Sequence, residues 1–315
     1  MPVANETLRV RCPEAFVATL DGTFGPARWS RNAAHWKTPA GPLRATISDI
    51  DAIAIGGRRV HGAIDVVQQI RLGSPKEAKA MAARHNTQPG LGLASVVPGI
   101  PSVIEVASRA CLFADEAKDG DRLGLNLAIA AICHMATSME YGAGKPVKRL
   151  PQHDEPCRWD RREFFTMMWI MDRAGDVVSF DGCTLIAQLK SLGDWLPGVT
   201  ARADARLALS GEHFHSVLGA GLAVEVSVCI GLGRVAANRF ASRLNELELK
   251  RVMGPPLFGA WAIDLTAQRL LFSSFWPNVG YVPNLLPRIA TWSVERLELV
   301  NNELWQIVGQ CKALL

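Results

Sequence analysis

The chain has 315 residues, of which 49% are hydrophobic and 20% charged, and its formal net charge is +4 at pH 7. These values are typical of a globular protein with a large core, and they exclude a disordered chain. A mild positive charge without clustered Lys and Arg permits an acidic partner but does not indicate nucleic-acid binding. The length predicts two domains of roughly 150 residues each.

The distribution of apolar residues and cysteines predicts a soluble, cytoplasmic protein that does not bind membranes. The N-terminus lacks a basic start followed by an apolar run, so no export signal is expected. The most apolar segment, 123–136, is too short to span a bilayer and contains Asn126 and His134. The seven cysteines are odd in number and include no CxxC pair, which argues against a disulfide framework.

The first half of the chain predicts a mixed unit of strands and helices. Its opening element is undefined, because Gly25 and Pro26 interrupt the pattern there. One helix has a clear start, with Ser74 as N-cap and Pro75 at the first helical position. The predicted elements, in order, are strands over 41–50 and 62–72, a helix over 74–86, a hairpin over 91–113 and a helix over 121–139.

A segment rich in Gly, Pro and charge, 141–162, predicts a linker between the halves. A helix is expected directly after it, over 162–173. Its Met-rich part, Phe164 to Met171, is apolar nearly all round, which predicts packing between the two halves. Met-rich surfaces also suit adaptable partner binding.

The second half shows the clearer pattern. Leu185, Leu189 and Leu192 have helical spacing over 183–196, with Asp181 available as a cap. Val224 and Val226 alternate with polar residues, as in a half-buried strand. The predicted elements that follow are strands over 199–209, 212–220 and 222–230, a helix over 233–249, two short strands over 262–272 and a closing helix over 285–308.

The two halves also resemble each other in sequence at an offset of 159 residues. "AARHN" (Ala82 to Asn86) falls on "ASRLN" (Ala241 to Asn245), and nine of the 55 ungapped positions from 59 to 113 are identical. "VIEVASRACLF" (Val103 to Phe113) falls on "AIDLTAQRLLF" (Ala262 to Phe272). We interpret the chain as a tandem duplication.

The predicted fold class is therefore α+β, with two tandem α-β-β-β-α-β-β-α units that contain antiparallel sheets. The first copy is assigned to 1–145, the linker to 146–159 and the second copy to 160–315. The two copies are expected to pack as an internal pseudo-dimer.

One known fold has this order of elements. The helix "NRFASRLN" and the hairpin "FGAWAIDLTAQRLLFSSF" resemble the secretion-chaperone-like fold of type III secretion chaperones and YbjN-type domains. The resemblance implies a non-enzymatic protein, cytoplasmic and linked to bacterial secretion. Such chaperones act as homodimers whose apolar grooves hold an extended partner segment. A tandem duplication would place both copies in one chain.

The uneven distribution of aromatic residues indicates where a partner would bind. Residues 1–157 contain two of the nine Trp and three of the eleven Phe, so the second copy holds most of them. Clustered aromatics in a loop are candidate binding anchors, although they can also cap a core. The candidate partner-binding residues are Trp261, Phe275, Trp276 and Tyr281.

The function that follows is a chaperone or adaptor for one protein partner, for example a secreted effector or a toxin. The protein would act as a monomeric pseudo-dimer or as a homodimer. A toxin-neutralising immunity protein is a third possibility: it would bind a protein in the same way and differ only in the identity of the partner.

The alternative is a small-ligand, metal or haem protein, or an enzyme, with a pocket between the copies. His213 and His215 would face the same side of a strand and are the weak candidates for metal ligands, but no third ligand is recognisable. GxSxG, HExxH and P-loop motifs are absent, so we assign no catalytic residue, expect no cofactor and leave enzymatic activity open.

Overall fold

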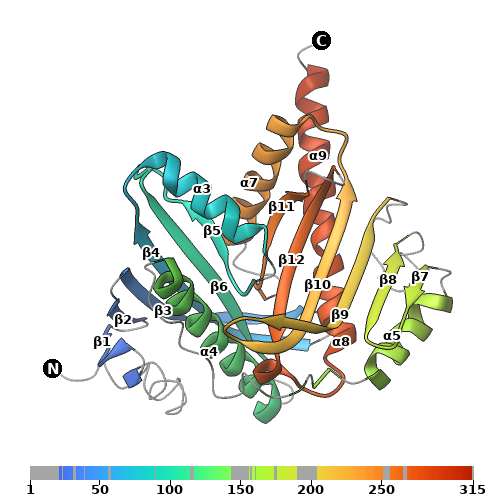
Figure 1. The fold of residues 1–315 in the computed structure, drawn as a ribbon, viewed down its shortest axis with the longest axis horizontal. Helices are drawn as coiled ribbons and strands as arrows, with labels where there is room; N and C mark the ends of the chain where they lie inside the picture. The colour runs from blue at the N-terminus through green and yellow to red at the C-terminus, as the bar shows by residue number, and fades with distance from the viewer. Residues whose placement is uncertain are drawn as a thin grey trace.

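The structure, a computed structural model, has an α+β fold with two six-stranded sheets in which every strand pairing is antiparallel (Figure 1). The predicted α+β class is therefore confirmed. None of the helices in the described part of the chain combines the length and apolar character needed to cross a membrane. The residues that the structure describes are 21–22, 24–30, 33–38, 40–55, 58–88, 90–113, 117–142, 156, 158–159, 161–173, 176–189, 204–250, 256–264 and 268–313.

The first sheet has the strand order β1-β2-β3-β4-β6-β5. The elements of this half are β1 (Arg28–Trp29), β2 (Ala33–Thr38), β3 (Gly41–Ile55), β4 (Arg58–Arg71), α3 (Pro75–Asn86), β5 (Leu93–Val96), β6 (Val103–Phe113) and α4 (Ala117–Gly142).

The second sheet has the strand order β11-β12-β10-β9-β8-β7. The elements of this half are α5 (Arg161–Arg173), β7 (Val177–Phe180), β8 (Thr184–Gln188), β9 (Arg206–His215), β10 (Gly219–Cys229), α7 (Arg234–Lys250), β11 (Ala260–Asp264), β12 (Arg269–Pro277), the 3-10 helix η1 (Asn278–Gly280), α8 (Leu286–Val294) and α9 (Arg296–Ala313).

The two sheets share one topology. Read from its short edge strand, the first runs β5-β6-β4-β3-β2-β1 and the second β11-β12-β10-β9-β8-β7, so each strand has a counterpart in the other half. Each half has four strands before its middle helix and two after it. The prediction of three strands before that helix was therefore wrong. In the second half, the strands predicted over 199–209 and 212–220 both overlap β9, and β7 and β8 were not predicted as strands.

The helix predicted over 183–196 is wrong in its first part. Residues 184–188 form β8, which pairs with β9 and buries Leu185 and Ala187 on one face. Asp181 does not cap a helix: its carboxylate accepts the backbone N–H groups of Cys183 (3.1 Å) and Thr184 (2.7 Å) and so closes the β7–β8 turn. Residues 190–203 lie outside the described part.

The middle helices α3 and α7 form where they were predicted. Ser74 caps α3 by accepting the backbone N–H of Glu77 at 3.2 Å, and Pro75 begins the helix. Each helix has a buried Asn in its C-terminal part that bonds the strand after it. Asn86 donates to the carbonyl of Ala94 and accepts its N–H, both at 2.9 Å. Asn245 makes the same two bonds with Trp261, at 2.9 and 2.8 Å.

This pair of bonds gives a matched stability test. We expect Asn86→Ala and Asn245→Ala each to lower the free energy of unfolding by about 2–3 kcal/mol, because each leaves a buried N–H and a buried carbonyl without a partner. Asn238→Ala, on the exposed side of α7, is expected to change it by less than about 0.5 kcal/mol. Urea denaturation of the three variants measures this. A neutral result at either buried Asn would contradict the shared role.

The sequence match between 103–113 and 262–272 does not reflect structural equivalence. Residues 103–113 form the single strand β6, whereas 262–272 cover the end of β11, the connection after it and the start of β12. The Asn bonds instead make Ala94 the counterpart of Trp261, at an offset of 167 residues. Val106 pairs with Ala94 and Phe272 with Trp261, so β6 and β12 correspond at an offset of 166.

The two halves meet through reciprocal contacts, which we call the junction. The helix α3 packs on β11, and its counterpart α7 packs on β5. Arg109 of β6 exchanges two backbone bonds with Leu257, at 3.2 and 3.0 Å, and Phe275 of β12 donates its N–H to the carbonyl of Gly90 at 3.1 Å. By the offsets above, Gly90 corresponds to Leu257 and Arg109 to Phe275. The contact between Arg109 and Leu257 thus corresponds to the contact between Phe275 and Gly90. Such pairs of equivalent contacts occur at a two-fold dimer interface.

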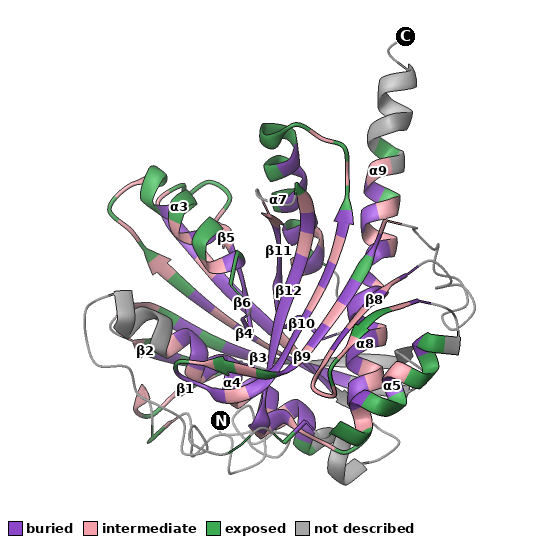
Figure 2. Ribbon diagram, turned by 45° about the vertical axis from the view of Figure 1, so that its right-hand side comes forward, coloured by how far each residue is buried: buried purple, intermediate pink, exposed green. Residues whose placement is uncertain are grey.

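One cluster of buried apolar side chains runs through both halves. Figure 2 shows buried residues along the centre of β4, β6, β10 and β12, and exposed residues on the outer sides of α3 and α5. The halves therefore share a core.

Candidate functional site

Three of the four aromatic residues predicted to bind a partner lie in the core. Trp261, Phe275 and Trp276 are at most 3% exposed. Tyr281 is partly buried, and its hydroxyl donates to Glu163 at 3.0 Å. The rings of β11 and β12 are buried because other elements cover both faces of this part of the sheet. In this structure these three rings are not available to a partner.

The helix α5 carries the exposed aromatic residues that the prediction placed elsewhere. Phe164, Met167 and Met171 are fully buried, whereas Phe165 is 55% and Trp169 52% exposed. α5 packs on β7, β8 and α8, all from the second half. Among the described residues, α5 therefore packs within the second half and not between the halves as expected.

The strand beside α5 is the outermost described strand of its sheet. In β7, Val178 is 60% exposed, and the ring of Phe180 contacts that of Phe165 edge to face at 6.2 Å between centroids. We call this set, Phe165, Trp169, Val178 and Phe180, the α5–β7 surface. Exposed aromatic and branched side chains next to a sheet edge suit the binding of an extended chain.

A pocket of about 490 Å³ opens at the N-terminal end of α5. It is lined by Arg158, Trp159, Arg161, Cys183, Gly211, Glu212 and Tyr281. The lining contains two guanidinium groups, of Arg158 and Arg161, and one carboxylate, of Glu212, so its net charge is positive. A hydrogen bond with Cys183 raises the pKa of Arg161, and the charges of Glu212 and Asp181 act in the same direction. This pocket belongs to the second half and does not lie between the copies.

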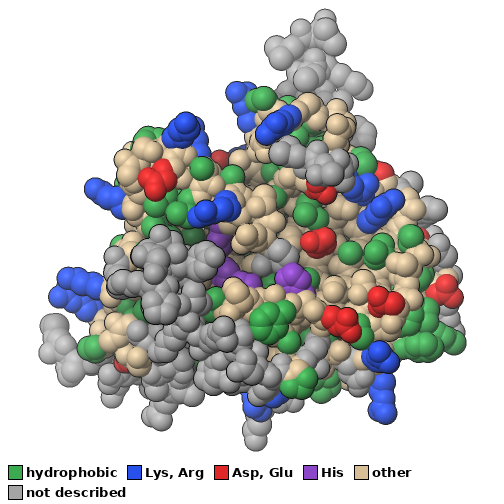
Figure 3. Space-filling view, in the orientation of Figure 1, with side chains coloured by type: hydrophobic (Ala, Val, Ile, Leu, Met, Phe, Trp, Pro, Cys, Tyr) green, Lys and Arg blue, Asp and Glu red, His purple; other side chains and the backbone are tan. Residues whose placement is uncertain are grey.

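The predicted histidines on β9 face the same side of the strand, as expected, because both rings contact Phe275. The ring of His213 packs against Phe275, with 5.5 Å between centroids. His215 also contacts His134 of α4, whose ring in turn contacts His85 of α3, with centroid distances of 5.0 and 5.5 Å. We call His85, His134 and His215 the histidine corner of the junction. In Figure 3, histidine side chains lie along the depression between the two halves.

In the histidine corner, burial favours the neutral form of His85 and His134. Burial lowers the pKa of His134 well below its usual 6.5, and the neighbouring His85 and His215 lower it further. Burial also lowers the pKa of His85, partly offset by its bond to the Gly92 carbonyl. Neither ring nitrogen of His134 has a hydrogen-bond partner among the described residues. Among the residues that the structure describes, no group of three His, Cys, Asp or Glu side chains is arranged to hold a metal ion.

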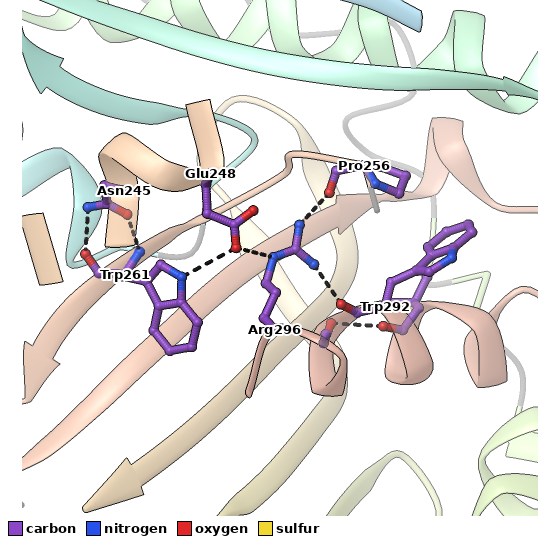
Figure 4. A network of polar contacts seen from close by, with 8 residues as sticks. Asn245, Glu248, Pro256, Trp261, Trp292 and Arg296 are labelled. Atoms are coloured by element: carbon purple, nitrogen blue, oxygen red, sulfur yellow. Dashed lines mark hydrogen bonds and ion pairs between the residues drawn. The ribbon is translucent and has the colours of Figure 1, made fainter. Parts of the chain in front are cut away.

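A buried ion pair lies at the corresponding corner of the junction (Figure 4). Arg296 and Glu248 are both 2% exposed, and Nε of Arg296 lies 3.1 Å from the Glu248 carboxylate. The guanidinium also donates to the carbonyls of Trp292 (2.8 Å) and Pro256 (2.6 Å). It lies 4.2 Å from the ring centre of Phe272. Pro256 precedes Leu257, the counterpart of Gly90. We call this the arginine corner.

Sequence reasoning missed His85 and His134, and for the segment from Phe164 to Met171 it gave partner binding only as the alternative to packing between the halves. His134 is a histidine within an apolar helix, and that alone could have marked it for attention. Its two partners are 49 and 81 residues away in the chain, so only the fold brings the three together.

Comparison of the chain with known protein families, with curated proteins and with solved structures gave no match.

Proposed function

We propose that the protein is a non-enzymatic protein-binding module that holds an extended acidic segment of a partner on the α5–β7 surface. The observation that carries this is the pair of half-exposed aromatic rings, Phe165 and Trp169, beside β7, the outermost described strand of its sheet. Large aromatic side chains supply most of the binding energy at protein interfaces.

The geometry favours an added strand. A partner segment paired with the outer edge of β7 would place alternate side chains against α5. An apolar residue at such a position would contact Phe165 and Val178. Backbone hydrogen bonds would supply affinity, and the apolar contacts would select the sequence.

The charge at the end of this surface favours an acidic residue. Arg161 is the first residue of α5, and Phe165 and Trp169 follow it at intervals of four, which places the three on one side of the helix. Arg158 and Arg161 line the adjoining pocket, and guanidinium groups bind carboxylates through paired, charge-assisted hydrogen bonds. A partner segment with an apolar residue followed by Asp or Glu fits both parts.

The resemblance to secretion chaperones leads to the same function. We propose that the two halves derive from one duplicated unit. Their common strand order and reciprocal junction support this origin. A secreted effector or a toxin is the kind of partner that such a chaperone would hold before release.

The test uses a defined probe. Random twelve-residue peptides displayed on phage are selected on the purified protein, and the enriched peptides are synthesised and measured by fluorescence anisotropy. We expect large apolar residues at alternate positions with a neighbouring Asp or Glu. The variant Phe165→Ser/Trp169→Ser should bind at least tenfold more weakly, since exposed aromatic anchors contribute about 2 kcal/mol or more each.

Phe214→Ser is the matched control, because Phe214 is 57% exposed but lies outside the α5–β7 surface. It should bind the peptides as the unsubstituted protein does. Arg161→Gln should weaken only the acidic peptides. Failure to enrich any peptide, or equal binding by the double variant and the control, would exclude this surface as the site.

A further inference from the structure

The histidine corner joins three elements from both halves of the molecule. His85 is in the last turn of α3, His134 lies within α4, and His215 is the last residue of β9. The backbone contact between the halves is next to them. A Cβ added to Gly90 would lie 3.6 Å from Nε2 of His134, and the Gly90 carbonyl accepts the N–H of Phe275. The ring of Phe275 stacks on His215 at 5.5 Å. Protonation of these rings would therefore act directly on the hydrogen bond between Phe275 and Gly90.

Backbone groups fix where the outer two rings carry their protons. Nε2 of His85 lies 3.2 Å from the Gly92 carbonyl and must donate to it, which leaves a lone pair on Nδ1. Nδ1 of His215 accepts the N–H groups of Val217 and Leu218, at 3.2 and 3.3 Å, so a neutral His215 carries its proton on Nε2.

His134 makes no hydrogen bond to the described residues, so burying its ring costs least free energy when the ring is neutral. A protonated His134 would bury two N–H groups, neither with an acceptor among the described residues. Its charge would also be buried about 5 Å from two other imidazoles. Of the elements packed on α4, none of β4, β6, β12 and η1 contributes a charge that shifts the pKa of His134; only His85 and His215 do. No described carboxylate compensates for a proton here.

The two corners of the junction differ in their response to protons. At the arginine corner, Arg296 is held by Glu248 and two carbonyls. At the histidine corner, the corresponding position is held by rings that are neutral only above their pKa.

We propose that the histidine corner is a proton-sensitive contact: it holds the two halves together at neutral pH, and its protonation releases the Gly90–Phe275 edge of the junction while the arginine corner stays closed. This inference does not depend on the proposed partner-binding function.

The direction of the pH effect follows from the two protonation equilibria. The pKa values of His85 and His134 are lower in the folded protein than the usual 6.5. As the pH falls, an opened corner therefore binds protons before the closed corner does. The stability of the closed corner is complete above pH 6.5 and is lost progressively below it.

Hydrogen–deuterium exchange tests this on the full chain. Between about pH 7.5 and pH 5.0, after correction for the intrinsic exchange rate, the protection of the Phe275 amide should fall at least tenfold. The Leu257 amide near the arginine corner should change less than about twofold. The variant His134→Phe should diminish the pH-dependent fall at Phe275, leaving only the contribution of His85. His35→Phe, at an exposed histidine, should retain it.

If His134→Phe does not fold, His85→Gln provides the second test, because its amide can still donate to Gly92 and does not titrate. An undiminished fall in the variant that folds would overturn the proposal. So would an equal fall at Leu257, since that would report opening of the whole molecule.

Discussion

Replacing Arg296 by methionine is expected to lower the free energy of unfolding by about 3–5 kcal/mol, because it leaves the carboxylate of Glu248 buried without a cation. Methionine is close to arginine in length, so the cavity is small and the lost charge is the main cause. The change also leaves the carbonyls of Pro256 and Trp292 without their donor. Urea denaturation followed by circular dichroism measures the loss.

A double variant separates the charge from the packing. Arg296→Met combined with Glu248→Leu removes both buried charges, and we expect it to recover most of the loss, because neither group then has to be desolvated. Glu248→Leu alone should be destabilising by a similar amount. If the double variant is as unstable as the sum of the single variants, the ion pair does not act as a unit.

The second large effect is expected for Trp276→Ala, which should lower the free energy of unfolding by about 3–5 kcal/mol. Trp276 is 3% exposed and packs between Phe258 and Trp292, at 5.2 and 5.9 Å between ring centroids. Its removal leaves a cavity lined by these rings. Thermal and urea denaturation measure the change.

Trp169→Ala is the matched control, because the same side chain is there 52% exposed. We expect it to change the free energy of unfolding by less than about 0.5 kcal/mol. Comparable destabilisation by the two variants would show that α5 is anchored through its outer side, and the α5–β7 surface would then be part of the core.

The elements that could be predicted are those whose ends or faces have a chemical signature. Ser74 and Pro75 identify the start of α3 because a cap and an N-terminal proline satisfy the requirements of a first turn. The alternation around Val224 and Val226 indicates β10 because only one face of that strand is fully buried. Such signals are local, so the sequence alone contains them.

The helix predicted over 183–196 shows why other elements could not be predicted. Leu185 and Leu189 fit helical spacing, but the same spacing occurs where a strand buries alternate residues against a neighbouring sheet element. Asp181 bonds the next N–H groups equally well in a turn and at a helix start. The pairing with β9, some twenty residues later, decides the outcome.

The candidate sites depend even more on tertiary structure. A cluster of Trp and Phe in the sequence does not reveal which rings the fold covers, so Trp276 and Trp169 could not be distinguished before the sheet was known. The histidine corner combines residues from three separate segments, and the sequence shows only that His134 is an unusual residue for an apolar helix.

The capping of α8 has a consequence for the order in which the chain folds. Leu285 at its start offers no side-chain cap, and the carboxylate of Glu163 instead accepts the N–H groups of Asn284 (3.0 Å) and Leu286 (3.3 Å). The acceptor leaves the ribosome more than 120 residues before the helix that needs it. A helix that depends on so distant a partner is poorly nucleated by itself. The start of α8 therefore gains its cap only once α5 has docked against it.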